Sequence, residues 1–275
     1  MQDQGLMAEL QPGDVAVIGV PLDKNSSFRR GPALGPAHIR ERLHCGSANL
    51  TAENGFNLAE SRRWRDLGDL VFREDQPEFA VIEAAIGGIV GRGARPLSLG
   101  GDHSITYPIL RAVARAHPGL TILHIDAHPD LYDELDGNRH SHACPFARII
   151  EEGLTARLVQ VGIRTINPLQ REQIKRFGVE TIEMRDWSFE RLPRFEGPLY
   201  VSLDLDALDP AFAPGVSHHE PGGFSTREAL RIIQSLTAPV VGADIVELNP
   251  LADVNAMTAM VAAKLLKEIV GQMLG

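Results

Sequence analysis

The sequence is poor in the features that mark secreted, membrane and nucleic-acid-binding proteins. Its 275 residues include only two cysteines, so we expect no disulfide framework, no thiolate zinc site and a reducing, cytoplasmic setting. No apolar run reaches the roughly 18 residues that span a bilayer, so we expect no membrane partner. The first ten residues lack the basic segment and apolar core of a secretory signal, and their acidity argues against a transit peptide.

Basic residues are also in deficit. Lysine and arginine together number 27 against 36 aspartates and glutamates, which gives a formal net charge of −9. This balance disfavours nucleic acids and anionic membranes as partners. An acidic cleft would instead attract a small cationic substrate.

No linker, low-complexity tract or internal repeat divides the chain, so we expect residues 1–275 to form a single domain. Strand-like apolar runs alternate with helix-like segments. The runs lie at 15–20, 96–99, 121–125, 157–163, 198–203 and 239–246, and the helices at 36–43, 77 onward, 103–117, 168–178, 226 onward and the C-terminus. This order predicts a three-layer α/β/α fold with a mainly parallel central sheet, and a barrel of eight βα units is the rival. The last helix is expected to pack one face on the core, comprising Val254, Met257, Val261, Leu265, Ile269 and Met273.

Three polar clusters follow strand-like runs directly. They read GGDHS at 100–104, DAHPD at 126–130 and SLDLDALDP at 202–210. Because ligands bind beyond the carboxyl ends of parallel strands, the three clusters are expected to meet at one sheet edge. Four aspartates and two histidines gathered there would leave uncompensated charge unless cations joined them. The sequence therefore predicts a metal site.

The spacing inside each cluster indicates two ions rather than one. Residues two apart in an extended segment face the same side, so Asp126, His128 and Asp130 share one side, as do Asp204 and Asp206. Imidazole and carboxylate ligands without thiolate suit Mn²⁺, Zn²⁺, Fe²⁺ or Ni²⁺ better than Ca²⁺. Two ions roughly 3.5–4 Å apart can share and activate one water. A single DxD motif holding one metal through phosphates is the alternative.

Given these clusters, the chain resembles the ureohydrolases, the family of arginases and agmatinases, and its motifs are most similar to those of plant-type arginases. The strings that carry the resemblance are DAHPD (126–130), SHA (141–143), VGIR (161–164), DPAFAPGVSH (209–218), GADIVELNP (242–250) and MTAMVAAK (257–264). The resemblance implies an arginase-like fold and a hydrolase that releases urea from a guanidino group. It also implies two Mn²⁺ per chain, with Ni²⁺, Co²⁺ or Fe²⁺ as alternatives, and a homo-oligomer, either trimer or hexamer.

The resemblance also implies which residues bind the metals. One ion would be held by His103, Asp126, Asp130 and Asp204, and the other by Asp126, His128, Asp204 and Asp206. Asp126 and Asp204 would then bridge the two ions.

Two further groups are implied for the substrate. Glu247 matches the family's guanidinium-binding glutamate, and bidentate pairing with a planar cation fits a carboxylate. A histidine suits protonation of the departing amine near pH 7. Of His140 and His142, the family pattern selects His142. We therefore expect His142, Glu247 and Asp130 to be catalytic.

The substrate tail is less specified. Asn138, Ser141 and Asn167 are candidate contacts, and residues 164–167 lack the acidic residue that animal-type arginases carry after this segment. L-Arginine is therefore favoured, with agmatine, another guanidino compound or formimidoylglutamate as alternatives. Two other classes remain open, namely an inactive metal-loaded partner subunit and a dinuclear phosphoesterase, which would need basic residues near the clusters. The sequence assigns no role to His218, His219 or Cys144, and Asp102 and Asp244 are candidates for orienting the ligands.

Overall fold

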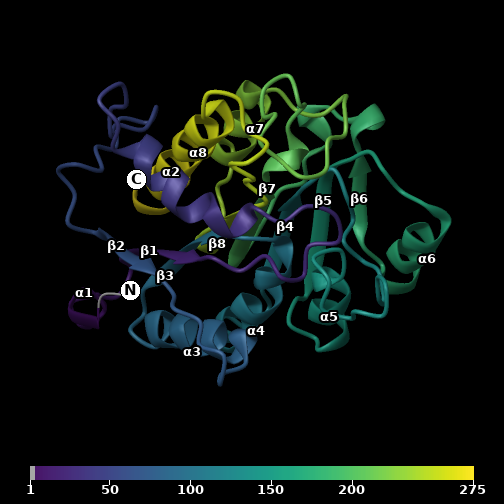
Figure 1. Cartoon of the computed structure of the whole chain (residues 1–275), viewed down its shortest axis with the longest axis horizontal. Helices are drawn as coiled ribbons and strands as arrows, with labels where there is room; N and C mark the ends of the chain where they lie inside the picture. The colour runs from purple at the N-terminus through teal and green to yellow at the C-terminus, as the bar shows by residue number, and fades with distance from the viewer. Residues whose placement is uncertain (1–3) are drawn as a thin grey trace.

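The computed structural model describes residues 4–275. Within this range the chain forms one sheet of eight parallel strands (Figure 1). The strands are β1 (Val15–Val20), β2 (Trp64–Asp69), β3 (Arg95–Gly100), β4 (Thr121–Ile125), β5 (Arg157–Ile163), β6 (Glu180–Glu183), β7 (Leu199–Asp204) and β8 (Val240–Val246). Their order across the sheet is β2-β1-β3-β8-β7-β4-β5-β6, so β2 and β6 are open edges and the sheet is not a barrel. Of the first ten residues, from which we expected no targeting signal, residues 1–3 lie outside the described range.

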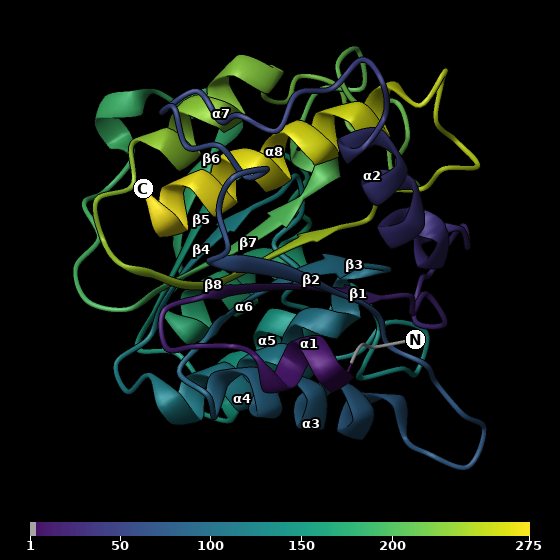
Figure 2. The same cartoon turned by 90° about the vertical axis from the view of Figure 1, so that its left-hand side faces the viewer.

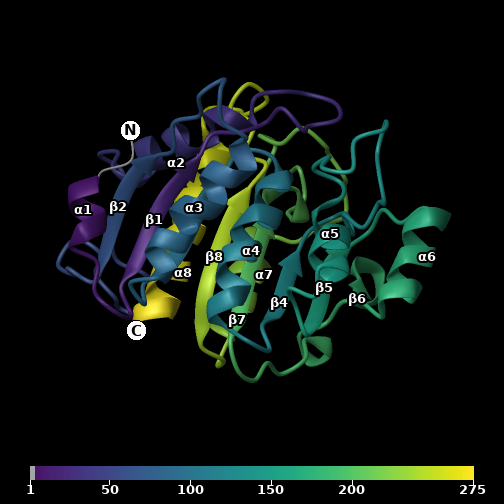
Figure 3. The ribbon, with the colours of Figure 1, turned by 90° about the horizontal axis from the view of Figure 1, so that it is seen from below.

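Helices cover both faces of the sheet, which confirms the predicted three-layer architecture. Figure 2 shows α2, α7 and α8 on one face and α1, α3, α4 and α5 on the other, and Figure 3 shows α3 and α4 lying across the central strands. The helices are α1 (Gln4–Ala8), α2 (Gly35–Leu43), α3 (Glu78–Val90), α4 (Thr106–Ala116), α5 (Pro145–Glu151), α6 (Pro168–Phe177), α7 (Thr226–Gln234) and α8 (Met257–Leu274). None of the helices in the described range is both long and apolar enough to cross a membrane.

The central strands are buried along their whole length, as parallel strands between two helical layers must be. Every residue of β1, β4, β7 and β8 is buried, and these strands are rich in valine, isoleucine and leucine. The predicted ranges 15–20, 121–125 and 157–163 match β1, β4 and β5. The predicted ranges 96–99, 198–203 and 239–246 overlap β3, β7 and β8, so the apolar runs also locate the strands that carry the candidate site.

Capping residues mark the ends of two helices. Asn167 caps α6 by accepting a hydrogen bond from the Gln170 amide, and Gly178 ends that helix with a φ of 64°. Ser225 and Glu228 form the capping box at the start of α7.

Four of the labelled strands and helices escaped the sequence prediction, and one of them is the short helix α1. The edge strands β2 and β6 read WRDLGD and ETIE and are mostly half-buried, so they lack the apolar run of a central strand. The short helix α5 follows the 126–144 loop. The predicted face of α8 also needs correction, because Val254 precedes the helix and is 52% exposed and Met257 is 49% exposed, whereas Leu265, Ile269 and Met273 are buried.

Candidate metal centre and its cavity

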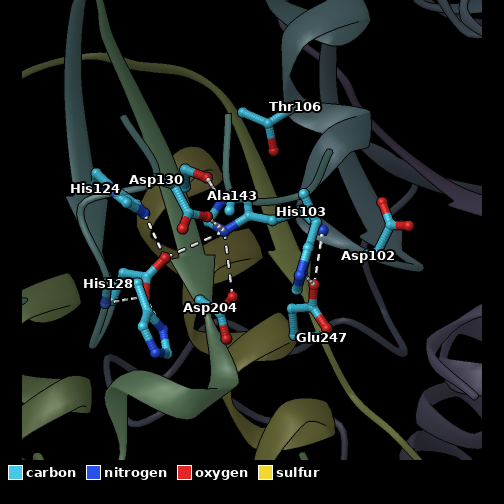
Figure 4. A network of polar contacts seen from close by, with 12 residues as sticks. Asp102, His103, Thr106, His124, His128, Asp130, Ala143, Asp204 and Glu247 are labelled. Carbon is cyan, nitrogen blue, oxygen red and sulfur yellow. Dashed lines mark hydrogen bonds and ion pairs between the residues drawn. The ribbon is translucent and has the colours of Figure 1, made fainter. Parts of the chain in front are cut away.

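The three polar clusters meet at the carboxyl edge of the sheet, as expected. The strands that carry them, β3, β7 and β4, lie in the middle of the sheet together with β8. His103 follows β3, residues 126–130 follow β4, Asp204 ends β7, and Glu247 follows β8. Figure 4 shows the side chains of His103, Asp130 and Asp204 turned toward one another. Gly101 lets the loop after β3 pass close to the backbone of Leu22, since a Cβ at this position would stand 1.8 Å from the Leu22 carbonyl oxygen.

His103 is the centre of the first ligand group. Its Nδ1 atom lies 3.2 Å from one carboxylate oxygen each of Asp126, Asp130 and Asp204. The His103 side chain is fully buried, and its Nδ1 has no hydrogen-bond partner among the described residues. Four donor atoms facing one point around an unpartnered buried nitrogen is the arrangement that a metal ion completes.

His128 is the centre of the second group. Its Nδ1 lies 3.1 Å from Asp206 Oδ2 and 3.4 Å from Asp126 Oδ1. Asp126 therefore turns Oδ2 toward His103 and Oδ1 toward His128, as a bridging carboxylate would. Asp204 also faces His103 through Oδ2, but its Oδ1 accepts a hydrogen bond from the Asp206 amide at 2.8 Å. The bridging role of Asp204 stays a prediction.

The carboxylates crowd one another electrostatically. Burial, followed by the charges of Asp206 and Asp126, raises the pKa of Asp204 well above its usual range. Burial and the charge of Asp126 likewise raise the pKa of Asp206 to about 6, although His128 opposes this. For His103, burial opposes protonation, but the three carboxylates around Nδ1 outweigh it and raise the pKa well above the usual range. Four carboxylates and two imidazoles meet here, so the carboxylates can all be ionised together only when cations join them, which favours metal ions.

A chain of hydrogen bonds orients His103. Its Nε2 lies 2.9 Å from Ser202 Oγ, and Ser202 donates its own hydrogen to Asp244 Oδ1 at 2.7 Å. Because the Ser202 hydrogen is already committed, His103 Nε2 must be the donor, which leaves the lone pair of Nδ1 for a metal. The second oxygen of Asp244 accepts hydrogen bonds from Thr106 and Tyr200. Asp244 thus occupies the orienting position suggested by the sequence.

His124 belongs to the cluster and was missed by the sequence analysis. It lies within β4, fully buried, with Nε2 2.7 Å from Asp126 Oδ2. Its ligand atoms fall close to those of His103, Asp126 and Asp130. A signal was present, because His124 precedes Asp126 by two residues and so faces the same side of the strand.

Glu247 combines a strained backbone with an unpaired oxygen. Its φ of 65° is rare for a residue other than glycine. Oε1 accepts hydrogen bonds from the His103 amide at 3.0 Å and from His142 Nδ1 at 2.8 Å. Oε2 is buried and has no partner among residues 4–275, although Glu247 lines the cavity described below. This oxygen is available to a cationic ligand.

The two candidate histidines of the 126–144 loop lie in different places. His142 is buried against Glu247, and its Nε2 lies 2.9 Å from Ser27 Oγ. Burial opposes protonation of His142, but the charge and hydrogen bond of Glu247 outweigh it and raise the pKa to about 9. His140 is exposed and stacks on Tyr107, with ring centroids 5.8 Å apart. Of these two histidines, only His142 lines the cavity.

A cavity of about 200 Å³ opens beside the cluster. Its walls are Ser27, His128, Asp130, Tyr132, Leu135, His142, Ala143, Thr165, Asn167, Gln170, Asp204, Asp206, His218 and Glu247. No lysine or arginine of the described chain lines it. The polar groups therefore comprise carboxylates, imidazoles, hydroxyls and amides, a set suited to a cation at the metal end.

The three candidates for tail contacts are placed differently. Asn167 lines the cavity, although its Oδ1 caps α6 and its Nδ2 donates to the Tyr132 hydroxyl. Asn138 and Ser141 are not among the lining residues, because Asn138 Nδ2 donates to Asn25 Oδ1 and Ser141 Oγ to the Asn25 carbonyl. The structure does not bring these two side chains to the cavity. Sequence analysis missed the lining residues Tyr132, Thr165 and His218, which lie in loops, and Gln170, which lies in α6.

Known proteins resemble the chain along most of its length. A sequence model described as "Arginase family" matches residues 13–271. "Arginase 1, mitochondrial" from Arabidopsis thaliana is 51% identical over 271 residues, covering 92% of this chain and 79% of the relative. "Agmatinase, mitochondrial" from Gallus gallus is 39% identical, covering 93% and 80%. The solved structure "Arginase from Medicago truncatula" has a TM-score of 0.91 at 45% identity, covering 98% of this chain and 90% of that one.

These relatives correct the expected cytoplasmic location. Arginases of Arabidopsis, rice and Medicago that match most of the chain are named mitochondrial or chloroplastic/mitochondrial, which points to an organelle rather than the cytoplasm. The expectation of a cytoplasmic location was wrong because cysteine usage distinguishes only oxidising compartments from reducing ones. It does not distinguish one reducing compartment from another.

Proposed function

The chain belongs to the arginase family, and we propose that it hydrolyses L-arginine to urea and ornithine at a dinuclear metal centre. The observation that carries this proposal is the unpaired Oε2 of Glu247, a residue that lines a cavity without basic residues beside the two ligand groups. Similarity to arginases at about half identity over nine-tenths of the chain supports arginine as the substrate.

The residues present fit a pair of Mn²⁺ ions. The donor set is four carboxylates and two imidazoles without sulfur, and one imidazole nitrogen is buried without a partner. His103, Asp126, Asp130 and Asp204 would hold one ion, and Asp126, His128, Asp204 and Asp206 the other. When bound, such a pair activates water near neutral pH and offsets the negative charge of the transition state. Ni²⁺, Co²⁺ and Fe²⁺ are chemically compatible alternatives to the proposed Mn²⁺.

Glu247 and His142 would act on the substrate itself. The guanidinium is planar and cationic, so pairing with Glu247 Oε2 holds its carbon facing the metal centre. His142, with a pKa of about 9, is protonated at neutral pH and can give a proton to the departing amine nitrogen. Because the protonated ring donates at both nitrogens, Ser27 Oγ accepts a hydrogen bond from His142 Nε2 and helps to orient the ring. The catalytic assignment of His142, Glu247 and Asp130 is part of this proposal.

The competing functions lose support from specific features. A phosphoesterase would need basic side chains for phosphate, and no lysine or arginine of the described residues lines the cavity. An inactive partner subunit would not need a hydrogen bond of 2.8 Å between Glu247 and His142 beside a complete ligand set.

Agmatine lacks the carboxylate of arginine, so the residues at the tail end of the cavity decide whether arginine or agmatine is the substrate. We propose Tyr132, Thr165 and Asn167 as neutral donors to that carboxylate, in place of Asn138 and Ser141.

Substrate choice and the role of Glu247 can be tested together. We expect kcat/KM for urea release to be higher with L-arginine than with agmatine. Glu247→Gln should lower kcat/KM for both substrates by similar factors, because Glu247 touches only their shared head group. The measurement is steady-state kinetics of wild type and variant on both compounds, with a phosphoester as a third substrate. A wild-type preference for agmatine would move the assignment to agmatinase. Unequal losses of kcat/KM on the two substrates would show that Glu247 does not bind only their shared guanidinium group.

We further propose that residues 1–275 act as one catalytic domain within a homo-oligomer, a trimer or hexamer. A single sheet with helices on both faces supports one domain. Exposed apolar side chains near the end of β8, namely Leu251, Val254 and Met257, support self-association. The partner at the site is the small guanidino substrate.

A further inference from the structure

We propose that His124 and Gln160 are positioning residues for the metal centre, with Gln160 fixing the tautomer of His124 so that His124 donates a hydrogen bond to Asp126. The inference rests on the proposed dinuclear centre and not on the choice of substrate. Both side chains are fully buried. Neither has a role in the binding of the guanidinium or in proton transfer.

The two residues belong to a polar row that crosses the sheet beneath the ligands. Residues paired in register on parallel strands point to the same face. The pairs are Ser98 with Asp244, Asp244 with Ser202, Ser202 with His124, His124 with Gln160, and Gln160 with Thr181. The row thus runs from β3 to β6 one layer below the metal ligands. Polar side chains in an otherwise apolar core require a reason, because burying them without partners is costly.

The orientation of the Gln160 amide follows from a backbone carbonyl. One amide atom of Gln160 lies 2.6 Å from the Pro129 carbonyl oxygen, which can only accept. That atom must therefore be the nitrogen, Nε2, and the opposite atom is the oxygen. The Thr181 hydroxyl donates to this oxygen at 3.2 Å, which agrees with the same orientation.

The tautomer of His124 follows from this amide. Gln160 Nε2 also lies 3.0 Å from His124 Nδ1, and its second hydrogen points there. His124 Nδ1 must then be the acceptor, so the ring carries its hydrogen on Nε2. His124 Nε2 lies 2.7 Å from Asp126 Oδ2 and donates to it. Because its Nε2 hydrogen is donated to Asp126, His124 is a hydrogen-bond donor to this carboxylate and not a metal ligand, although it lies within the cluster (Figure 4).

One amide thereby holds two of the metal ligands. Through His124 it orients Asp126, the carboxylate that faces both ligand groups. Through the Pro129 carbonyl it restrains the backbone next to Asp130, whose φ of 51° is unfavourable for a residue other than glycine. Partners of this kind orient metal ligands, and their loss typically costs roughly 10–100-fold in metal affinity.

Two substitutions of His124 separate hydrogen bonding from packing. The His124 ring also packs on Phe146, with ring centroids 3.9 Å apart. His124→Phe keeps an aromatic ring but removes the donor, whereas His124→Gln keeps an N–H donor near the position of Nε2 but removes the ring. If donation to Asp126 is what matters, His124→Phe should lose roughly 10–100-fold in Mn²⁺ affinity and His124→Gln should retain most of it. If packing is what matters, the order is reversed.

The experiment is equilibrium dialysis of the full chain against Mn²⁺, giving the number of ions bound and their affinity. Ser98→Ala is the matched control, because Ser98 lies in the same row and its hydroxyl has no hydrogen-bond partner among the described residues. We expect its Mn²⁺ affinity to equal that of the wild type. Gln160→Leu, which keeps His124 but removes its orienting amide, should weaken Mn²⁺ binding in the same direction as His124→Phe. It decides the question if either His124 variant fails to fold by circular dichroism.

The outcomes distinguish this inference from the proposed function. Failure of wild-type protein to bind two Mn²⁺ would overturn the proposed centre and this inference with it. Wild-type affinity in His124→Phe or in Gln160→Leu would overturn the inference alone. An equal loss of Mn²⁺ affinity in His124→Gln and His124→Phe would also overturn it, because the donor retained in His124→Gln would then have no effect on metal binding.

Discussion

Asp126→Ala is expected to bind neither metal ion and to lose urea release by on the order of 10⁴-fold or more. The two oxygens of this carboxylate face the two histidine-centred groups, at 3.2 Å from His103 Nδ1 and 3.4 Å from His128 Nδ1. Its removal therefore takes one ligand from each ion at once. Metal content by atomic emission and urea release from L-arginine are the two measurements.

Asp186→Ala serves as the control for this prediction, because Asp186 lies in a 3-10 turn away from the cavity and is exposed. It should keep both ions and wild-type activity. Asp204→Ala should resemble Asp126→Ala if Asp204 also bridges, and should keep the His128-centred ion if it does not. Retention of one tightly bound ion in Asp126→Ala would show that Asp126 is not the bridge.

His142→Ala is expected to keep both metal ions and lose on the order of 10²–10⁴-fold in kcat. The Glu247 carboxylate raises the pKa of His142 to about 9, so the imidazole carries its proton below that pH and loses it above. Wild-type kcat/KM should accordingly fall as the pH rises through about 9, because this profile reports the groups of the free enzyme, and the residual kcat/KM of His142→Ala should lack this fall. The measurement is kcat/KM for L-arginine against pH, with metal content determined for each sample.

His140→Ala is the matched control, since His140 stacks on Tyr107 at the surface and does not line the cavity. It should keep both the rate and the alkaline fall of the wild type. If His140→Ala loses the rate and His142→Ala does not, the two assignments must be exchanged.

The sequence predicts where the cluster of histidines and carboxylates lies, because its position depends on strand ends. Buried parallel strands are recognisable as apolar runs, and their carboxyl ends share one edge of the sheet whatever their order. The placement of His103, Asp126 and Asp204 therefore required no knowledge that β3, β8, β7 and β4 are neighbours. The starts of α6 and α7, expected at 168 and 226, depend on capping residues that are equally local.

The tail end of the cavity depends on loops, and sequence patterns do not place loop side chains. Asn138 looked accessible beside His142, yet its amide is used by Asn25, which is 113 residues away along the chain. Tyr132 and His218 both line the cavity, although their loops lie far from each other in the sequence. His124 was missed for a different reason, because a single histidine inside an apolar run is read as part of the strand.

The central claim is that two metal ions, held by this ligand set, make the chain a urea-releasing enzyme. The most direct measurement is a titration of metal-free protein with Mn²⁺ while urea release from L-arginine is followed. We predict no urea without metal, and a rate that rises until about two equivalents per chain are bound and then stays constant. Urea release by the metal-free chain, or a rate that saturates at one equivalent, would contradict the account.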